Sequence, residues 1–200
     1  MTTISSNPLR LAPLLLALTL AGCGGPAGSG ASSYLLPASP ATRQHDSRLI
    51  VNLAPIDTAT FLDGEGIVMQ LDELEVHQAR GHLWAEALPN QLQHLLQRRL
   101  SSALPQAQVV TRGQVQATST AGEGRELRLR LDRFQGRYDG IALIQGQWQL
   151  LNHAGVLLEQ QDFRIETPLS ADGYPALVRS LASGWEQLAD GIATELVRQR

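Results

Sequence analysis

The chain contains a single thiol, Cys23, within the segment Leu20-Ala21-Gly22-Cys23. A lone cysteine cannot form an intramolecular disulfide, so its chemistry must be of another kind. Small side chains directly before a cysteine suit the pocket of a peptidase that cuts ahead of it and leaves the thiol and the new amino group free for acylation. The residue types and their order therefore predict a covalent lipid on Cys23 and no other cofactor.

Residues 1–22 have the organisation of a signal peptide. Arg10 and the amino terminus supply positive charge, and the apolar run from Leu11 to Leu20 follows. A signal peptide needs about 7 to 15 apolar residues, whereas a membrane span needs about 20. The alternative, a buried core helix with an ordinary cysteine, fits poorly with Pro13 and the nearby glycines. We expect cleavage before Cys23, at the motif called the lipobox in bacterial lipoproteins.

Acylation of this kind would hold the protein at a membrane permanently. Each buried methylene contributes about 0.8 kcal/mol, so that one fatty chain gives marginal binding and two give stable anchoring. The residue after the cysteine is Gly24, not the aspartate that retains lipoproteins of enteric bacteria at the inner membrane. We therefore expect the protein at the outer membrane, anchored by lipid and facing the periplasm.

Histidines and glycines offer two further candidate sites, and both are weak. His77 and His82 lie five residues apart with Glu75 nearby, but no third ligand follows at a spacing typical of zinc sites. The pair Gly64 and Gly66 lacks the third glycine of a dinucleotide-binding loop and precedes a predicted strand, so a hairpin turn explains it. We expect no metal site.

Groups for nucleophilic or acid–base catalysis are not organised in the sequence. No serine lies in a Gly-x-Ser-x-Gly motif, and Ser183 lies inside a predicted amphipathic helix. The carboxylates are scattered over turns and strand ends. We therefore predict that the protein is not an enzyme. The formal net charge of −3 also argues against nucleic acid, for which a basic stripe is expected.

Composition divides the chain into three parts. Residues 1–22 form the signal peptide, and residues 23–47 form a lipidated flexible tether that begins with a glycine- and serine-rich spacer. Residues 48–200 form a single domain, long enough to bury a core without disulfides. Within the tether, Tyr34 to Pro37 is a brief apolar island that we interpret as a short edge strand.

The domain shows strand and helix patterns in a definite order. Leucines at helical spacing predict a helix over 85–104, and a second apolar face predicts a helix over 173–197. Alternating or β-branched stretches predict strands at 48–55, 67–71, 74–77, 108–111, 127–131, 141–151 and 156–165. The pattern predicts an α+β fold, a mostly antiparallel sheet with two amphipathic helices packed on one face.

Several segments, taken together, resemble the family of transport-auxiliary lipoproteins. The similarity runs from Tyr34 to the end of the chain, although the Tyr-Tyr-type pair expected near the tether is only Ser33-Tyr34 here. The segments that carry it are Tyr34-Leu35-Leu36-Pro37, Gly66-Ile67-Val68-Met69-Gln70, Leu83-Trp84-Ala85, residues 134–140, residues 146–155, Asp172-Gly173-Tyr174, and Trp185 with Ile192-Ala193.

The resemblance implies a place in an intermembrane transport system. The protein would be an outer-membrane lipoprotein whose partners are a periplasm-spanning MCE-domain protein and, indirectly, an integral inner-membrane transporter component. Such systems are thought to move lipids or other hydrophobic molecules between membranes. The lipoprotein would dock the far end of the MCE protein at the outer membrane, as a ring-forming homo-oligomer. The family offers no catalytic residues to carry over.

Three residues are candidates for contact with the partner. Arg137 and Tyr138 precede the turn dipeptide Asp139-Gly140, and arginine and tyrosine are enriched at interfaces. The alternative is a tight hairpin in which Arg137 pairs with a carboxylate. Trp84, just before the first predicted helix, either packs beneath that helix or projects toward a partner, and the sequence does not separate the two.

Two other functions compete with the docking role. A direct lipid carrier would need an apolar cavity, which means a sheet face or groove that the two helices leave uncovered. An envelope hydrolase would need a catalytic set. The sequence favours docking, because both helices have wide apolar faces and because no catalytic set is apparent.

Overall fold

A computed structural model describes residues 30–111 and 123–198. Cys23, the predicted signal peptide and the glycine-rich spacer lie outside the described residues. The folded unit begins at Ala31. Its elements are β1 (Ser32–Tyr34), β2 (Leu49–Leu53), β3 (Asp57–Thr58), the 3-10 helix η2 (Thr60–Leu62), β4 (Gly66–Gln70), β5 (Val76–Trp84), α1 (Leu88–Ala103), β6 (Gln108–Thr111), β7 (Glu123–Arg137), β8 (Ile141–Asn152), β9 (Leu157–Pro168) and α2 (Tyr174–Arg198).

The sheet is organised around β7, its longest strand. One edge of β7 pairs with β8, which pairs with β9, both antiparallel. The other edge is shared by three short parallel strands, β2, β3 and β4, one after another along β7. β5 and β1 extend the sheet beyond β4, and β6 extends it beyond β2. The sheet is therefore mixed, although its two longest ladders are antiparallel.

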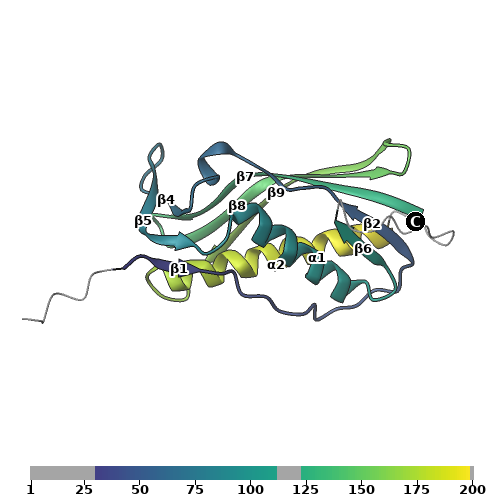
Figure 1. The fold of residues 1–200 in the computed structure, drawn as a ribbon, viewed down its shortest axis with the longest axis horizontal. Helices are drawn as coiled ribbons and strands as arrows, with labels where there is room; N and C mark the ends of the chain where they lie inside the picture. Colours follow the sequence, from purple (N-terminus) through teal and green to yellow (C-terminus); the bar gives the residue numbers. More distant parts are fainter. Residues whose placement is uncertain (1–29, 112–122, 199–200) are drawn as a thin grey trace, which may run out of the picture. The chain divides into compact units, whose positions relative to one another are not determined.

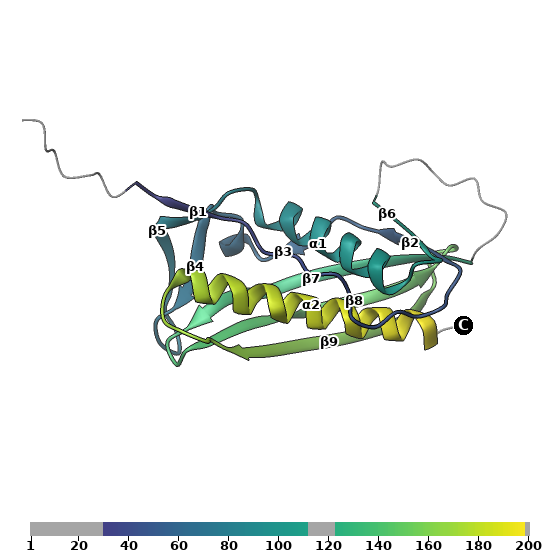
Figure 2. The ribbon, with the colours of Figure 1, turned by 90° about the horizontal axis from the view of Figure 1, so that it is seen from below.

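Both helices pack on one face of this sheet, as Figures 1 and 2 show. The inward positions of β7 and β8 alternate with outward ones, so that Leu127, Leu129 and Leu131 face the helices. Trp185 of α2 is buried beside Phe134 and donates a hydrogen bond from Nε1 to the carbonyl of Leu92 at 3.1 Å. The predicted α+β arrangement is confirmed.

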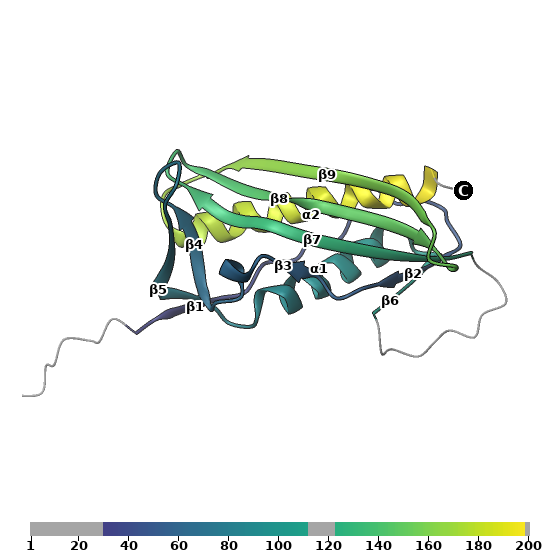
Figure 3. The ribbon, with the colours of Figure 1, turned by 90° about the horizontal axis from the view of Figure 1, so that it is seen from above.

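The opposite face of the sheet is polar and is seen in front of the helices in Figure 3. Its cross-strand pairs join glutamines to charged or amide side chains. Gln147 donates to Asp162 at 2.7 Å, and Gln149 donates to Gln160 at 2.8 Å. A sheet with one apolar and one polar face needs helices on one side only.

Residues 35–47, which we call the strap, cross the helices instead of hanging free (Figure 2). The Leu36 amide donates to Gln91 Oε1 at 2.9 Å, the Ala41 amide to Ser102 Oγ at 3.0 Å, and the His45 amide to the carbonyl of Ala103 at 2.7 Å. The predicted boundary at residue 48 therefore differs from the structure, in which the folded unit starts at Ala31. The strap is held by its backbone polar groups and by the side chain of Leu36, which is buried in the core.

A buried arginine joins the strap to both helices. Arg99 of α1 donates to the two carboxylate oxygens of Asp190 on α2 at 2.8 and 2.7 Å, and lies 3.2 Å from Glu186. Its Nη1 also donates to the carbonyls of Ser39 and Pro40, at 3.0 and 2.9 Å. Bidentate pairing of this kind, followed by nearby carboxylate charge, raises the pKa of Arg99.

Most element bounds match the sequence-based predictions within a few residues. Two strands are longer than predicted. β7 covers Glu123–Arg137, whereas the sequence predicts a strand over 127–131, and β5 covers Val76–Trp84, whereas the sequence predicts a strand over 74–77. The central residues of β5, Gln78 to Gly81, show no clear apolar alternation. Of these residues only Gln78 has a partner in β4, Val68; the register then shifts, and the next pair joins Leu83 to Gly66.

Candidate functional site

The two histidines considered for metal binding lie on the same strand and make different contacts. Tyr34 and His82 are hydrogen-bonded through the tyrosine hydroxyl and Nδ1 at 2.8 Å, and the His82 ring stacks on Tyr174 with centroids 3.9 Å apart. His77 is exposed and is opposite Met69 of β4, on the other side of the register shift in β5 from His82. Within residues 30–111 and 123–198, no three acidic, histidine or cysteine side chains gather as metal ligands would.

The Tyr34–His82–Tyr174 cluster ties the start of the folded unit to the start of α2. Burial first, and the nearby Tyr34 second, raise the pKa of Tyr174. The hydroxyl of Tyr174 is therefore neutral at physiological pH. The cluster is a packing contact between β1, β5 and α2, which explains why the Tyr34 segment is apolar in an otherwise polar stretch.

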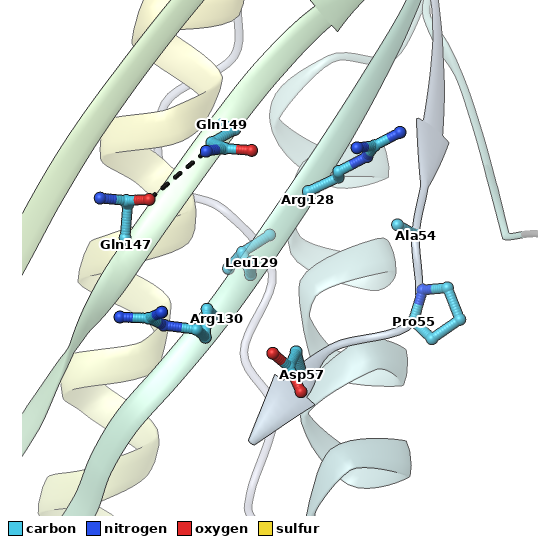
Figure 4. Close-up of a pocket in the computed structure, with 8 residues that line it drawn as sticks. All are labelled: Ala54, Pro55, Asp57, Arg128, Leu129, Arg130, Gln147 and Gln149. Carbon is cyan, nitrogen blue, oxygen red and sulfur yellow. Dashed lines mark hydrogen bonds between the residues drawn. The ribbon is translucent and has the colours of Figure 1, made fainter. Parts of the chain in front are cut away.

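A pocket of about 290 Å³ opens on the polar face of the sheet (Figure 4). Arg128 and Arg130 of β7 lie in its wall, and each already has an acidic neighbour, Glu126 at 2.7 Å and Asp132 at 3.2 Å. Its lining comprises Ala54, Pro55, Asp57, Arg128, Leu129, Arg130, Gln147 and Gln149. Amides, guanidinium groups and one carboxylate lie beside Ala54, Pro55 and Leu129, so this surface hollow has a mixed polar and apolar lining.

A second pocket, of about 220 Å³, lies beneath the strap. It is lined by Thr42, Arg43, His45, Ala103, Asp190, Ala193 and Thr194, most of them polar. A lipid carrier needs a predominantly apolar cavity of several hundred Å³. Both pockets are smaller than typical ligand cavities of about 300–1,000 Å³, and the second is lined mostly by polar residues. In the part of the chain that the structure describes, neither helix combines the length and the apolar character that a bilayer-spanning segment requires.

Arg137 lies at the end of β7, in the turn that leads to β8. Its guanidinium donates to Glu166 Oε1 at 2.7 Å and forms a short ion pair with Asp139. Gly140, with a φ of 77°, completes a tight turn whose amide donates to the carbonyl of Arg137 at 3.2 Å. The hairpin alternative therefore describes Arg137, and its charge is used within the chain. Tyr138 at the tip is exposed.

Trp84 lies in the core, where only 6% of its surface is exposed. Its ring centroid is 6.1 Å from that of Phe134, at an angle of 54°. Of the two possibilities that the sequence left open, packing beneath α1 is the one that the structure shows. The predicted partner contact of Trp84 is therefore corrected, because a buried side chain has no surface to offer.

The β4–β5 loop was not recognised from the sequence as a candidate contact surface. Leu71, Leu74 and Val76 are exposed there, Leu74 almost completely at 95%. Residues 74–77, Leu-Glu-Val-His, alternate apolar and polar side chains, which is why the sequence predicts a strand there. The signal that could have indicated a turn is Asp72, since aspartate often accepts hydrogen bonds from amides two and three residues later.

This loop lies beside the β7–β8 turn. β4 and β7 run parallel with Gln70 opposite Arg137, so that the residues that follow, Leu71 and Tyr138, emerge next to each other. The Gln135 side chain donates to Gln70 Oε1 at 3.1 Å and joins the two strands just below. We call the loop at 71–76 together with the turn at 137–140 the hairpin end.

Comparison with known proteins agrees with the sequence resemblance. Residues 34–193 match the profile of a family described as the ABC-type transport auxiliary lipoprotein component. The chain is 34% identical over 189 residues to the intermembrane transport lipoprotein PqiC of Escherichia coli K12, an alignment that covers 92% of this chain and 95% of that protein. The PqiC of Shigella flexneri matches equally well.

Solved structures show the same fold. A crystal structure of an uncharacterised protein superposes with a TM-score of 0.72 at 30% identity and covers 84% of this chain and 99% of its own. A protein from Xanthomonas campestris gives a TM-score of 0.69 at 16% identity, which supports the fold alone. The extent of the profile match and of the identity to PqiC leads to one assignment: the chain belongs to the family of ABC-type transport auxiliary lipoproteins.

Proposed function

We propose that the protein is the outer-membrane lipoprotein subunit of an MCE-type intermembrane lipid transport system, where it docks the periplasm-spanning MCE protein and supports envelope integrity. The observation that carries this proposal is the 34% identity to PqiC, described as an intermembrane transport lipoprotein, over nearly the whole of both chains. An inner-membrane component of the same system would be an indirect partner. A ring of several copies would suit a docking role around a tubular partner.

The anchor in this proposal is Cys23. Lipid attached there would place the folded unit at the outer membrane, facing the periplasm, because Gly24 gives no signal for retention at the inner membrane. A docking role rather than a carrier role is supported by the small volumes of the two pockets, about 290 and 220 Å³, compared with about 300–1,000 Å³ for typical ligand cavities.

Replacing Cys23 by alanine should release the protein from the membrane without unfolding it. The lipid is the only anchor in the proposal, and the folded unit starts eight residues later, at Ala31. Fractionation of cells that express Cys23→Ala should recover the chain in soluble periplasmic fractions, with the far-ultraviolet circular dichroism of the wild type. A variant still acylated and held in the membrane would refute the lipobox interpretation.

The docking role predicts a stable complex between the lipidated chain, purified in detergent, and the MCE protein. Native mass spectrometry should detect both proteins together and give the number of lipoprotein copies. Absence of a complex, together with co-purified lipid bound to the lipoprotein, would support the carrier alternative instead. Turnover of an ester or glycan substrate by the purified chain would support the hydrolase alternative.

A further inference from the structure

Exposed apolar side chains are concentrated at the hairpin end. Of the seven large hydrophobic residues that are exposed in the described part of the chain, four lie there: Leu71 at 47%, Leu74 at 95%, Val76 at 42% and Tyr138 at 59%. The other three, Leu35, Val156 and Leu157, are a strap residue and a pair in the β8–β9 turn. A group of apolar residues at one place on a surface marks an interaction site more strongly than scattered ones.

Hydrogen bonds hold this apolar group in a fixed shape. Asp72 Oδ1 accepts from the amides of Leu74 and Glu75, at 2.8 Å each, and the amide of Leu71 donates to the carbonyl of Glu75 at 2.9 Å. The neighbouring turn is held by the ion pairs of Arg137. A loop that is already ordered loses less entropy when a partner binds, which favours Leu74 as an anchor residue.

The apolar group is surrounded by negative charge. Asp72, Glu73 and Glu75 are exposed, and the two amide hydrogen bonds lower the pKa of Asp72, so that it stays ionised well below neutral pH. The nearest cation across the strand pairing, Arg137, is bound to Asp139 and Glu166. A partner at this surface must therefore combine an apolar recess with arginine or lysine side chains around it.

The β4–β5 loop and β1 lie at opposite ends of β5. Ser32 of β1 is opposite His82, six residues along β5 from Val76, where the loop ends. The charge and the apolar side chains of the hairpin end therefore define the chemistry of its partner, and the identification of that partner as the MCE protein rests on the proposed function.

We propose that the hairpin end is the docking surface for the MCE protein, which would receive Leu74 and Tyr138 in an apolar recess rimmed by basic side chains. An anionic lipid surface fits less well, because three carboxylates within four residues would face it. A second copy of this chain also fits less well as the partner. Its pocket in Figure 4 contains Arg128 and Arg130, but both arginines have acidic neighbours and Asp57 adds a further carboxylate, so the pocket would not attract the acidic hairpin end.

Two variants of the full lipidated chain in detergent test the apolar and the charged parts separately. Leu74→Ser should weaken binding of the purified MCE protein at least about tenfold, as expected for an interface anchor. The triple change Asp72→Asn, Glu73→Gln and Glu75→Gln removes three charges but keeps a side-chain oxygen at position 72 that can accept the hydrogen bonds of the backbone amides at positions 74 and 75. It should remove most of the loss of affinity that added salt causes in the wild type.

Leu157→Ser and Asp162→Arg are matched controls, because they change an exposed leucine and an exposed acid elsewhere on the sheet. Both should bind the MCE protein as the wild type does. Equal affinity of Leu74→Ser and the wild type would overturn the docking surface but leave the proposed function standing. Failure of the wild type itself to bind the MCE protein would remove the proposed function as well.

A photo-crosslinking amino acid at position 74 of the lipidated chain in cells identifies what covers the surface. A crosslink to the MCE protein, mapped to a segment with basic residues, is the expected result. A crosslink to a second copy of the chain or to lipid would overturn the proposal. The same probe at position 157 should give no crosslink to the MCE protein.

Discussion

Replacing Arg99 by methionine should destabilise the folded chain by about 2 kcal/mol, because hydrogen bonds to a charged group contribute about 1.5–3 kcal/mol and the carboxylate partners of this buried arginine are partly exposed. The Arg99 side chain is 9% exposed and is shared by Asp190, Glu186 and two strap carbonyls. Glu186 and Asp190 are four residues apart on α2, so that without the arginine their charges repel each other.

Urea unfolding of the wild type and Arg99→Met in the same detergent measures this loss. Hydrogen exchange adds a local test: the amides of Ser39 and Ala41 should exchange faster, since the strap loses its central attachment. The neighbouring Arg98 is exposed, and Arg98→Met should leave both measurements unchanged within about 0.5 kcal/mol. Unchanged stability of Arg99→Met would mean that the carboxylates and carbonyls are satisfied by water without it.

Gly146→Ala should cost about 3 kcal/mol, at the upper end of the range for overpacking. A Cβ at this position of β8 would lie 2.1 Å from the carbonyl oxygen of Arg130 and 2.8 Å from the ring of Phe163. The first neighbour is backbone of the central strand, beside the register shift between Leu131 and Arg133, so the contact cannot be relieved by a rotamer change.

Gly191→Ala is the matched control for this change. The position lies within α2, and a Cβ there meets no atom within 4 Å. Alanine is the better helix former, so this variant should gain about 0.5–1 kcal/mol. The midpoint temperature of thermal unfolding should therefore fall for Gly146→Ala and rise for Gly191→Ala. A neutral Gly146→Ala would show that β7 and β8 can separate locally at no cost.

The sequence predicted the two helices and the long antiparallel strands well, because their apolar residues recur with a clear period. Leu127, Leu129 and Leu131 alternate in β7, and leucines of α1 return every three or four residues. The strap was interpreted as a free tether for the opposite reason. Its polar attachments are backbone amides and carbonyls bound to Gln91, Arg99 and Ser102, and such contacts leave no pattern in the sequence.

The candidate site was predicted less completely than the fold. Tyr138 was predicted from its residue type, and it is exposed. Arg137, predicted in the same way, forms an ion pair with Glu166 near the end of β9, a residue distant in the sequence. Leu74 could not be identified, because its exposure depends on Asp72 closing a turn where alternation suggested a strand. The pairing of β4 with β7 that brings Leu71 beside Tyr138 joins segments more than sixty residues apart.

The central place of β7 also determines in what order this chain can fold. β2, β3 and β4 precede β7 by more than fifty residues, yet all three depend on its edge. Before β7 is available, the β2–β6 pair is an isolated two-stranded piece, which is marginal in water, and β1, β5 and β4 form a separate small sheet. Native contacts so distant in sequence make folding slow. We therefore expect the chain to stay unfolded until its second half is complete.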